Sequence, residues 1–418
     1  MPQKLKIASA QARTLSTTNE TLHALEETSK RAASQGVDIV LFPEAYLGGY
    51  PRTCHFGAAV GARAPEGREQ FLHYFHDAVD IGDTPAGAGN DWLDKKLELP
   101  RGKKYRGDGT REELERVARE TGVFIVTGLV ERCAGTLYCA AVFVCPKLGI
   151  LGKRRKVMPT GSERLIWGQG TASTLRAVTT EIKGVKLTMG SAICWENYMP
   201  MLRQSLYMQN VNLWFAPTAD ARDTWESLMR TVGCEGRCFV VSANQCVRKR
   251  HLPEWISMAN KKSGESKANG HAEEPKPPVG ASGRRKSTIC KTDEGNEIYL
   301  PIIEGSETRS NVDDTSAIES STQSVKVDAP NINQFAQAQT SSADGDEFVS
   351  RGGSCIISPL GEVLAGPLWE SEDELITVEV DFEDCERGRL DFDAGGSYSR
   401  SDQFKLQVEG LDLAPPPF

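Results

Sequence analysis

A cysteine, a glutamate and a lysine each stand just beyond an apolar segment, where a strand is expected to end. Cys194 follows Met189–Ile193, Glu44 follows Val37–Phe42, and Lys156 closes a basic run. Residues at the ends of strands in an open α/β fold can converge above one edge of a sheet. A thiol, a carboxylate and an ammonium gathered there could supply a nucleophile, a general base and a stabiliser of negative charge.

The setting of Cys194 predicts a reactive thiol. The small, apolar run before it is typical of a strand, and the residues after it favour a helix. Such an elbow would expose the thiol beside backbone N–H groups and the positive end of a helix, which favour the thiolate. Taken alone, the elbow leaves a second interpretation open, because a single cysteine after an apolar strand is often an inert buried thiol.

Three long stretches resemble the nitrilases of the carbon-nitrogen hydrolase superfamily, in the expected order, and the segment Ala78–Thr110 together with Asn197–Pro200 is most similar to the fungal type. The three stretches are Phe42–Pro51, Arg155–Arg164 and Cys194–Pro200, and further similarity covers most of the chain outside residues 253–347. The resemblance implies an αββα sandwich, whereas periodicity alone would also allow a doubly wound sheet. It also implies that the site needs no cofactor and no metal.

The resemblance assigns roles to four residues of this chain. Cys194 would be the nucleophile, and Glu44 would be the general base that takes the thiol proton and later activates water. Lys156 would stabilise the negative charge that develops on the substrate, and Glu163 would orient the substrate and the lysine. For Glu163, an ordinary ion pair with a neighbouring arginine is the alternative.

Aromatic residues stand inside or beside the same stretches. Tyr50, Trp167 and Trp195 are predicted to line the substrate pocket, where their rings could accept aromatic or arylaliphatic nitriles. Core packing is an equal alternative for all three.

The implied reaction is hydrolysis of an organic nitrile to a carboxylic acid and ammonia through a thioimidate and a thioester. A cyanide hydratase or an amidase would share the Glu-Lys-Cys site, and a non-catalytic scaffold would keep only the fold. A cysteine–histidine hydrolase is disfavoured, because none of the six histidines lies in a cysteine-protease signature. His55 lies nearest to a motif, and we interpret it as a solvated loop residue.

The chain departs from the family pattern beside the site. Gly161 stands where many relatives have histidine, Thr171-Ala172 stands where they have Asp-Gly, and Ser397 replaces a frequent histidine of the tail. These changes leave the four site residues in place. They bear on substrate range and assembly.

Composition limits the classes of partner and the expected location. The 418 residues carry a net charge of −8, which disfavours a nucleic-acid partner. No apolar run approaches the roughly 20 residues of a membrane span, and no secretory leader is evident, so we expect a cytoplasmic enzyme acting on a small molecule. The eleven cysteines are predicted to be reduced thiols, and Cys234 with Cys238 lacks the second pair that a zinc site requires.

Two parts of the sequence form the expected domain. Residues 1–252 and 348–418 are predicted to make a single hydrolase domain, and residues 253–347, poor in large apolar side chains, are predicted to be a disordered insertion. The tail 392–418 is expected to help build a homo-oligomer, either a dimer or a larger spiral. A solvated terminus is the alternative.

Local signals place helices and strands between the motifs. Thr17–Glu20 resembles a capping box that starts a helix, and Arg111–Thr121 is predicted as a helix that Gly122 closes. Strands are predicted at Val123–Val126, Leu137–Val144, Leu213–Ala216, Phe239–Val241 and Cys355–Ile357.

Overall fold

The computed structural model describes residues 3–253, 255–256, 287–291, 297–301 and 346–418. Its contacts divide the chain into one unit of Met1–Ala268 with Asp344–Phe418 and a second unit of Asn269–Ala343. In the second unit, β13 (Ser287–Lys291) pairs antiparallel with β14 (Glu297–Pro301). Most of the segment 253–347, which we predicted to be disordered, lies outside the described residues.

A six-stranded sheet forms one layer of the first unit, in the order β17-β1-β2-β5-β6-β7. The neighbours β1, β2 and β5 are parallel, whereas β6, β7 and β17 pair antiparallel with their neighbours. The strand bounds are β1 Lys4–Ala12, β2 Ile39–Leu41, β5 Phe124–Cys133, β6 Thr136–Cys145, β7 Gly149–Arg155 and β17 Asp373–Asp381.

A seven-stranded sheet forms the second layer, in the order β12-β15-β11-β10-β9-β8, with β16 paired to β15. Here β9, β10 and β11 are parallel, so their carboxyl ends meet at one edge. The strand bounds are β8 Val178–Ile182, β9 Val185–Ser191, β10 Leu213–Thr218, β11 Phe239–Asn244, β12 Cys246–Arg248, β15 Phe348–Ile357 and β16 Val363–Trp369.

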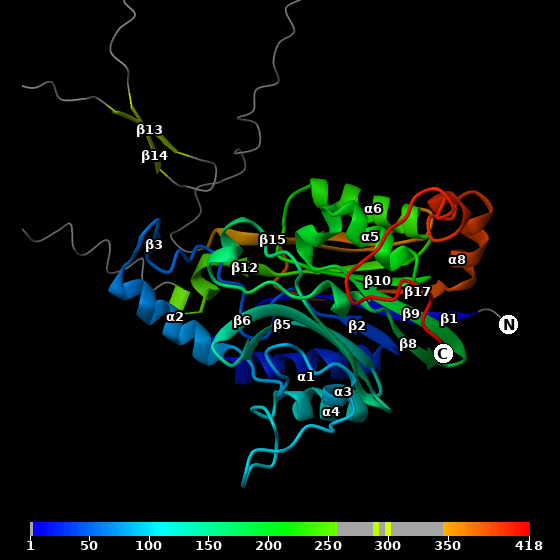
Figure 1. The fold of residues 1–418 in the computed structure, drawn as a ribbon, viewed down its shortest axis with the longest axis horizontal. Coiled ribbons are helices and arrows are strands. Elements are labelled where there is room, and N and C mark those ends of the chain that lie inside the picture. The colour runs from blue at the N-terminus through cyan, green and yellow to red at the C-terminus, as the bar shows by residue number, and fades with distance from the viewer. Residues whose placement is uncertain (1–2, 254, 257–286, 292–296, 302–345) are drawn as a thin grey trace, which may run out of the picture. The chain divides into compact units, whose positions relative to one another are not determined.

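Helices cover the outer face of each sheet (Figure 1). The six-stranded sheet carries α1 (Thr18–Ser34), α3 (Asn90–Leu93) and α4 (Thr110–Thr121), and the seven-stranded sheet carries α5 (Pro200–Tyr207) and α6 (Thr224–Gly236). The predicted αββα sandwich is therefore confirmed. Two further helices are α2 (Pro65–Asp77) and α8 (Glu383–Arg387), and a small hairpin joins β3 (Ala58–Ala59) to β4 (Ala62–Arg63). Within the described residues, no helix combines the length and apolar character needed to cross a membrane.

The two sheets face each other across an apolar layer. Ile7 and Phe124 enter it from the first sheet, Phe215 and Val241 enter it from the second, and all four are at most 1% exposed. Burial of side chains of this size contributes about 1.5–3 kcal/mol each. The layer fixes the two sheets against each other and thereby fixes the strand ends that carry the site.

Two local predictions for helix ends are confirmed. The Thr17 side chain accepts the backbone N–H of Glu20, and the Glu20 carboxylate accepts the backbone N–H of Thr17, which completes the capping box of α1. Gly122 ends α4 in the left-handed conformation, with φ at +72°. Glycine adopts this conformation without the penalty that a Cβ would impose.

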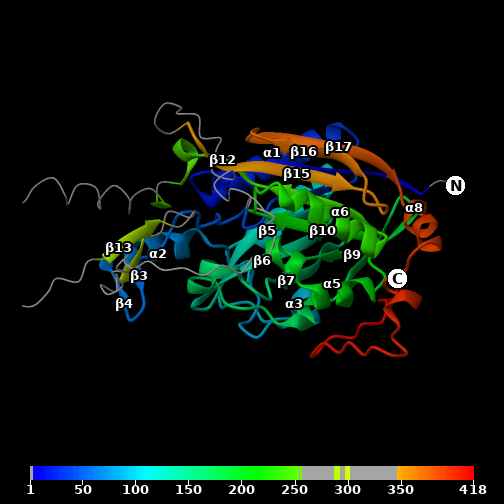
Figure 2. The ribbon, with the colours of Figure 1, turned by 90° about the horizontal axis from the view of Figure 1, so that it is seen from above.

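The last part of the chain contributes to both sheets. Figure 2 shows the orange strands β15, β16 and β17 running along one edge of the unit, where the chain passes from the second sheet to the first. The Gln11 side chain of β1 accepts the backbone N–H groups of Gly353 and Ser354 of β15, so β1 is linked to both β15 and β17. The first and last strands therefore close the sandwich together.

Candidate active site

The predicted site residues stand where strands end. Glu44 follows β2, Lys156 follows β7, and Cys194 follows β9 as the first residue of the short 3-10 helix η3 (Cys194–Tyr198). Glu163 lies in a second 3-10 helix, η1 (Gly161–Leu165). The structure joins three of these groups directly, because Lys156 Nζ lies 2.7 Å from Glu44 Oε1 and 2.7 Å from Glu163 Oε2.

Glu163 is held by more than the lysine. Its Oε2 also accepts the backbone N–H of Thr160 at 2.7 Å, and its Oε1 accepts the Tyr50 hydroxyl at 2.7 Å. The alternative of an ion pair between Glu163 and a neighbouring arginine is wrong. Arg155 pairs with Glu131 instead, and Arg164 donates to a backbone carbonyl.

A close backbone approach brings Glu44 to the site. A Cβ on Gly128 of β5 would lie 2.2 Å from the carbonyl oxygen of Pro43 and 2.8 Å from the Cα of Glu44, so only glycine fits there. On the other side, Gln245 Nε2 donates to the Glu44 carbonyl at 2.9 Å. Strand packing and one amide thus fix the backbone that carries this carboxylate.

Burial and charge set the protonation of the site. Glu44 and Lys156 are fully buried. Burial raises the pKa of Glu44, and although Lys156 lowers it, the second carboxylate at Glu163 raises it again, which leaves that pKa at about 7. Burial alone would lower the pKa of Lys156, but Glu44, Cys194 and Glu163 carry it well above its usual range. The site holds a permanent cation beside a base that titrates near neutral pH.

Cys194 occupies a strained elbow. Its φ of +52° is in the left-handed region, which residues other than glycine adopt at a cost of about 1–3 kcal/mol. Strain of this kind concentrates at functional sites. The Thr218 hydroxyl donates to the Cys194 sulfur at 3.3 Å, from the end of β10. This elbow therefore has the geometry expected of a positioned nucleophile.

The prediction that this thiol is exposed and acidified is wrong. Cys194 is only 4% exposed, because it packs in an apolar cluster with Ile193, Trp167 and Trp255. Burial, together with the nearby Glu44, raises the pKa of the Cys194 thiol. The short η3 begins at Cys194 itself, and the longer α5 begins only at Pro200, so neither of these helices is a long helix starting at the sulfur. The thiol keeps its proton until a base removes it.

The Glu196 carboxylate links the backbone next to Cys194 to the backbone next to Lys156. Glu196 Oε2 accepts the backbone N–H of Ile193 at 2.7 Å, and its Oε1 accepts the backbone N–H of Val157 at 2.6 Å. Arg154 neutralises it at 2.6 Å and also donates to the Ser191 carbonyl at 2.5 Å. Glu196 therefore fixes the residues next to Cys194 and Lys156 relative to each other.

We expect the Glu196→Ala variant to lose about 3–5 kcal/mol of unfolding free energy, because the buried Arg154 would keep its charge without a partner. Urea unfolding of the full chain measures the loss. A suitable control is Glu120→Ala, which removes the half-exposed partner of Arg116 and should cost less than about 1 kcal/mol. Equal losses in the two variants would contradict the role assigned to Glu196.

The aromatic residues named from the sequence surround these groups. Tyr50 contacts Glu163, as described above, and Trp167 Nε1 donates to the Tyr74 hydroxyl at 2.9 Å. The ring of Trp167 lies under Lys156, with Nζ 5.6 Å from its centroid. Trp195 directly follows Cys194 in the sequence, and its Nε1 donates to Asp220 Oδ2 at 2.7 Å. That they bind substrate remains a prediction.

Residues whose side chains contact the site were missed from the sequence, among them Thr218 and Cys139. The strand predicted at Leu213–Ala216 extends in the structure to Thr218 as β10. A polar side chain next to the end of a predicted strand was a signal that could have identified Thr218. Cys139 lies inside β6 with its sulfur 3.5 Å from Glu44 Oε1, and the sequence carries no sign of this, because β6 is apolar throughout its centre.

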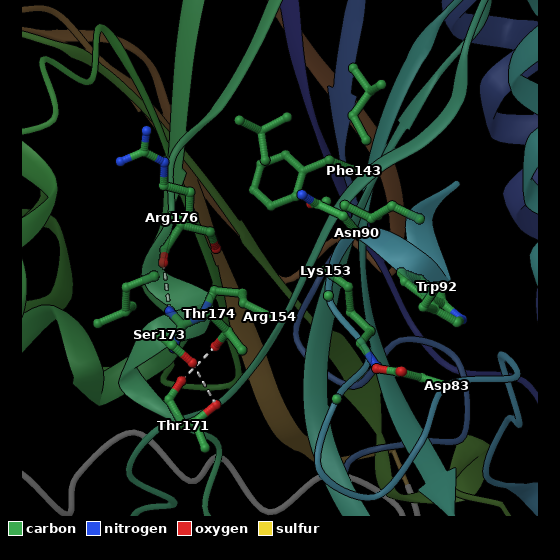
Figure 3. A pocket seen from close by; sticks show the side chains of 18 of the residues that line it. Asp83, Asn90, Trp92, Phe143, Lys153, Arg154, Thr171, Ser173, Thr174 and Arg176 are labelled. Atoms are coloured by element: carbon green, nitrogen blue, oxygen red, sulfur yellow. Dashed lines mark hydrogen bonds and ion pairs between the residues drawn. The ribbon is translucent and has the colours of Figure 1, made fainter. Parts of the chain in front are cut away.

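Other candidate groups lie apart from the site. His55 is exposed, and its Nδ1 accepts the backbone N–H of Gly57. A cavity of about 320 Å³ opens beside β7, where Lys153 points to Asp83 (Figure 3), and the four site residues are absent from its lining. Among the residues that the structure describes, no cluster of three metal-ligating side chains occurs.

Comparison with known proteins settles the family. The sequence profile described as "Carbon-nitrogen hydrolase" matches residues 6–389. The chain belongs to the carbon-nitrogen hydrolase family. The membership predicted from the three stretches is thereby confirmed.

Curated relatives of this hydrolase are named as nitrilases. An arylacetonitrilase from Trametes versicolor is 34% identical over 93% of this chain and 91% of its own. A nitrilase from Bradyrhizobium diazoefficiens is 34% identical over 91% and 84%, and a bifunctional nitrilase/nitrile hydratase from Lupinus angustifolius is 33% identical over 96% and 84%. Among solved structures, an amidase from Nesterenkonia sp. matches with a TM-score of 0.48 at 14% identity, over 93% of this chain and 95% of its own.

The pKa of Glu44 predicts the pH dependence of the hydrolase. A general base at Glu44, the role predicted from the sequence, must be deprotonated to accept a proton, so that role predicts that kcat/KM rises with pH through a one-proton transition centred at about 7. Because Glu163 raises the pKa of Glu44, the Glu163→Gln variant should shift this midpoint to lower pH. Initial rates across the neutral range measure both. A midpoint near the ordinary pKa of a glutamate would contradict the assignment.

Proposed function

We propose that this enzyme hydrolyses organic nitriles to carboxylic acids and ammonia, with Cys194 as nucleophile. The observation that carries the proposal is the buried Lys156 ammonium, which forms ion pairs with both Glu44 and Glu163 and interacts electrostatically with the Cys194 thiol. The relatives' names favour nitriles as the substrate class.

The first half of the reaction forms a covalent thioimidate. Glu44 takes the Cys194 proton while the sulfur attacks the nitrile carbon, and the electron pair of the breaking π bond goes to nitrogen. Because the thiol pKa is raised and that of Glu44 is about 7, the proton leaves as the carbon–sulfur bond forms. Lys156 stabilises the charge on nitrogen, and Glu44 then returns the proton to it.

The second half adds two molecules of water. Glu44 deprotonates the first water as it attacks the thioimidate carbon, which gives a tetrahedral intermediate with sulfur, hydroxyl and amine substituents. Glu44 passes the proton of the first water to the former nitrile nitrogen. Transfer of the hydroxyl proton through Glu44 to the amine then breaks the carbon–nitrogen bond, which expels ammonia and leaves a thioester. The second water, again activated by Glu44, releases the carboxylic acid and restores the Cys194 thiol.

The tetrahedral intermediate has a second exit, which would release an amide. If the sulfur leaves before ammonia, the net reaction is hydration of the nitrile. The name of the lupin relative includes both activities, which supports amide as a second product of this enzyme.

Glu163→Gln is expected to lower kcat by at least about tenfold and to raise the amide fraction of the product. The carboxylate holds Lys156 and Tyr50 by charge and hydrogen bond, and an uncharged amide would hold the ammonium less firmly at the leaving nitrogen. Chromatography of acid and amide measures the ratio. The control is Tyr50→Phe, which removes only the hydrogen bond from Tyr50 to Glu163; kcat and the amide fraction should change in the same direction as in Glu163→Gln, but by less. An unchanged kcat and an unchanged amide fraction in Glu163→Gln would contradict the role proposed for Glu163.

Substrate class is tested with the purified full chain. Ammonia release is measured from phenylacetonitrile, benzonitrile, an aliphatic nitrile and a matching amide, and cyanide is scored by formamide. Turnover of an organic nitrile establishes the proposal, whereas turnover of cyanide alone would make the enzyme a cyanide hydratase. Turnover of the amide alone would make it an amidase, and a folded protein inactive on all of them would favour a scaffold.

Three further points belong to the proposal. Residues 1–252 and 348–418 form a single hydrolase domain, and the enzyme acts in the cytoplasm. The tail 392–418 joins subunits of a homo-oligomer. In the structure, the tail carbonyls of Asp412 and Pro417 accept hydrogen bonds from Arg176 and Thr179 of the same chain, so this tail lies against the start of β8 and the residues just before it.

A further inference from the structure

The two carboxylates of the site differ in how their oxygens are used. Both oxygens of Glu163 accept hydrogen bonds, as described above. Glu44 Oε1 accepts from Lys156, but Glu44 Oε2 is buried and has no partner among the residues that the structure describes. A buried carboxylate oxygen without a donor is uncommon and calls for an explanation.

Cys139 contacts both members of the central ion pair. Its sulfur lies 3.5 Å from Glu44 Oε1, and its backbone carbonyl accepts the N–H of Lys156 at 2.7 Å. Cys139 is fully buried in β6, between β5 and β7. One residue therefore fixes the base through its side chain and the lysine through its main chain.

The Cys139 thiol can only donate in this place. Burial and the neighbouring Glu44 raise its pKa well above the usual range, so it stays protonated. An S–H group is a weak donor, but it points at a carboxylate in a dry site, where hydrogen bonds are stronger than in water. Lys156 and Cys139 together therefore occupy Oε1 with two donors.

We propose that Cys139 is a positioning residue for the general base. Its thiol and Lys156 hold Glu44 Oε1, and this leaves Oε2 as the oxygen that accepts the Cys194 proton and later the proton of water. The proposal rests on the proposed function, because it assigns a task to Glu44 in that reaction.

The groups that titrate around Glu44 are known from the structure. Lys156, Glu163, Cys139, Cys194 and Tyr50 interact electrostatically with it or with each other. The Cys139 hydrogen bond favours the charged form of Glu44, so its removal should raise the pKa of Glu44. None of the other groups changes in a Cys139 variant, which makes the pH profile a specific readout.

The test compares Cys139→Ala and Cys139→Ser with the unchanged enzyme in the full chain. For Cys139→Ala we expect the midpoint of the kcat/KM profile to move upward by several tenths of a pH unit and kcat to fall about threefold to tenfold, with KM unchanged. Cys139→Ser restores a stronger donor, so its midpoint should stay at or below that of the unchanged enzyme.

The control is Cys145→Ala, a buried thiol at the end of the same strand, whose midpoint should not move. Equal loss of rate at every pH in Cys139→Ala, with the midpoint fixed, would show a packing role and overturn the proposal. If Cys139→Ala fails to fold, a raised midpoint in Cys139→Ser would overturn it alone. Absence of nitrile turnover in the unchanged enzyme would instead overturn the function on which the proposal rests.

Discussion

Cys194→Ala should abolish turnover of every nitrile, with a loss of at least about 10⁴-fold in kcat, because no other group in the reaction forms the bond to carbon. The change removes one sulfur whose hydrogen bond comes from Thr218, so the unfolding free energy should change by about 1 kcal/mol. Ammonia release and urea unfolding measure the two quantities. Intact-protein mass after mixing with a slow nitrile should show an adduct on the unchanged enzyme and none on the variant.

Cys139→Ala is the matched control for that experiment. It removes a second buried thiol, which contacts Glu44 Oε1. Turnover within about tenfold of the unchanged enzyme is expected from this control. Comparable activity in the two alanine variants would show that Cys194 is not the nucleophile.

Lys156→Met should lower kcat by at least about 10³-fold, because the charge developing on nitrogen loses its cation. It should also cost about 3–5 kcal/mol of unfolding free energy, since Glu44 and Glu163 would remain buried without their shared partner. Loss of the ammonium raises the pKa of Glu44 further in the folded state. The cost is therefore larger at about pH 8, where Glu44 of the unchanged enzyme is ionised, than at about pH 5, where Glu44 is protonated in both folded proteins.

The chain supplies a matched control for the lysine as well. Lys153 lies in β7, shortly before Lys156 in the sequence, and it also bridges two carboxylates. Its Nζ is 2.5 Å from Asp83 and 2.6 Å from Glu131, and its side chain is 6% exposed. Lys153→Met should cost a similar unfolding free energy but keep kcat within about tenfold. A similar kcat loss in both variants would assign the effect of Lys156→Met to folding.

The family resemblance of the sequence predicted the αββα sandwich, and it predicted which charged residues form the site. Glu44, Lys156 and Glu163 could be placed because each stands in a stretch with a family pattern, and the structure puts the three in direct contact. Their catalytic roles remain predictions. The prediction for Cys194 was wrong in its environment, because a strand-to-helix elbow does not reveal which side chains of distant segments cover it.

Contacts between strands explain what the sequence could not show. Gly128 lies in an apolar strand and looks like any strand glycine, yet its missing side chain admits the Glu44 segment. Cys139 meets Glu44 only because β6 lies next to both β5 and β7. Pairings of this kind depend on strand order, which a single sequence does not contain.

The departure at Gly161 has a local explanation. Gly161 opens η1 with φ at +48°, a conformation that favours glycine, and a side chain there would meet open space. A glycine at this position therefore allows, without strain, the turn that places Glu163 beside Lys156. Nothing in the structure explains Thr171-Ala172 or Ser397 in the same way.

The closure of both sheets by the last strands determines when this protein can fold during synthesis. Residues up to 253 leave the ribosome with β1 exposed along the edge that β17 covers and with β11 lacking its neighbour β15. Neither sheet is complete until the residues after 346 have emerged, so the nascent chain carries open strand edges throughout synthesis of the segment between them. Translation through that segment sets a minimum waiting time before Glu44, Lys156, Glu163 and Cys194 can be held in place.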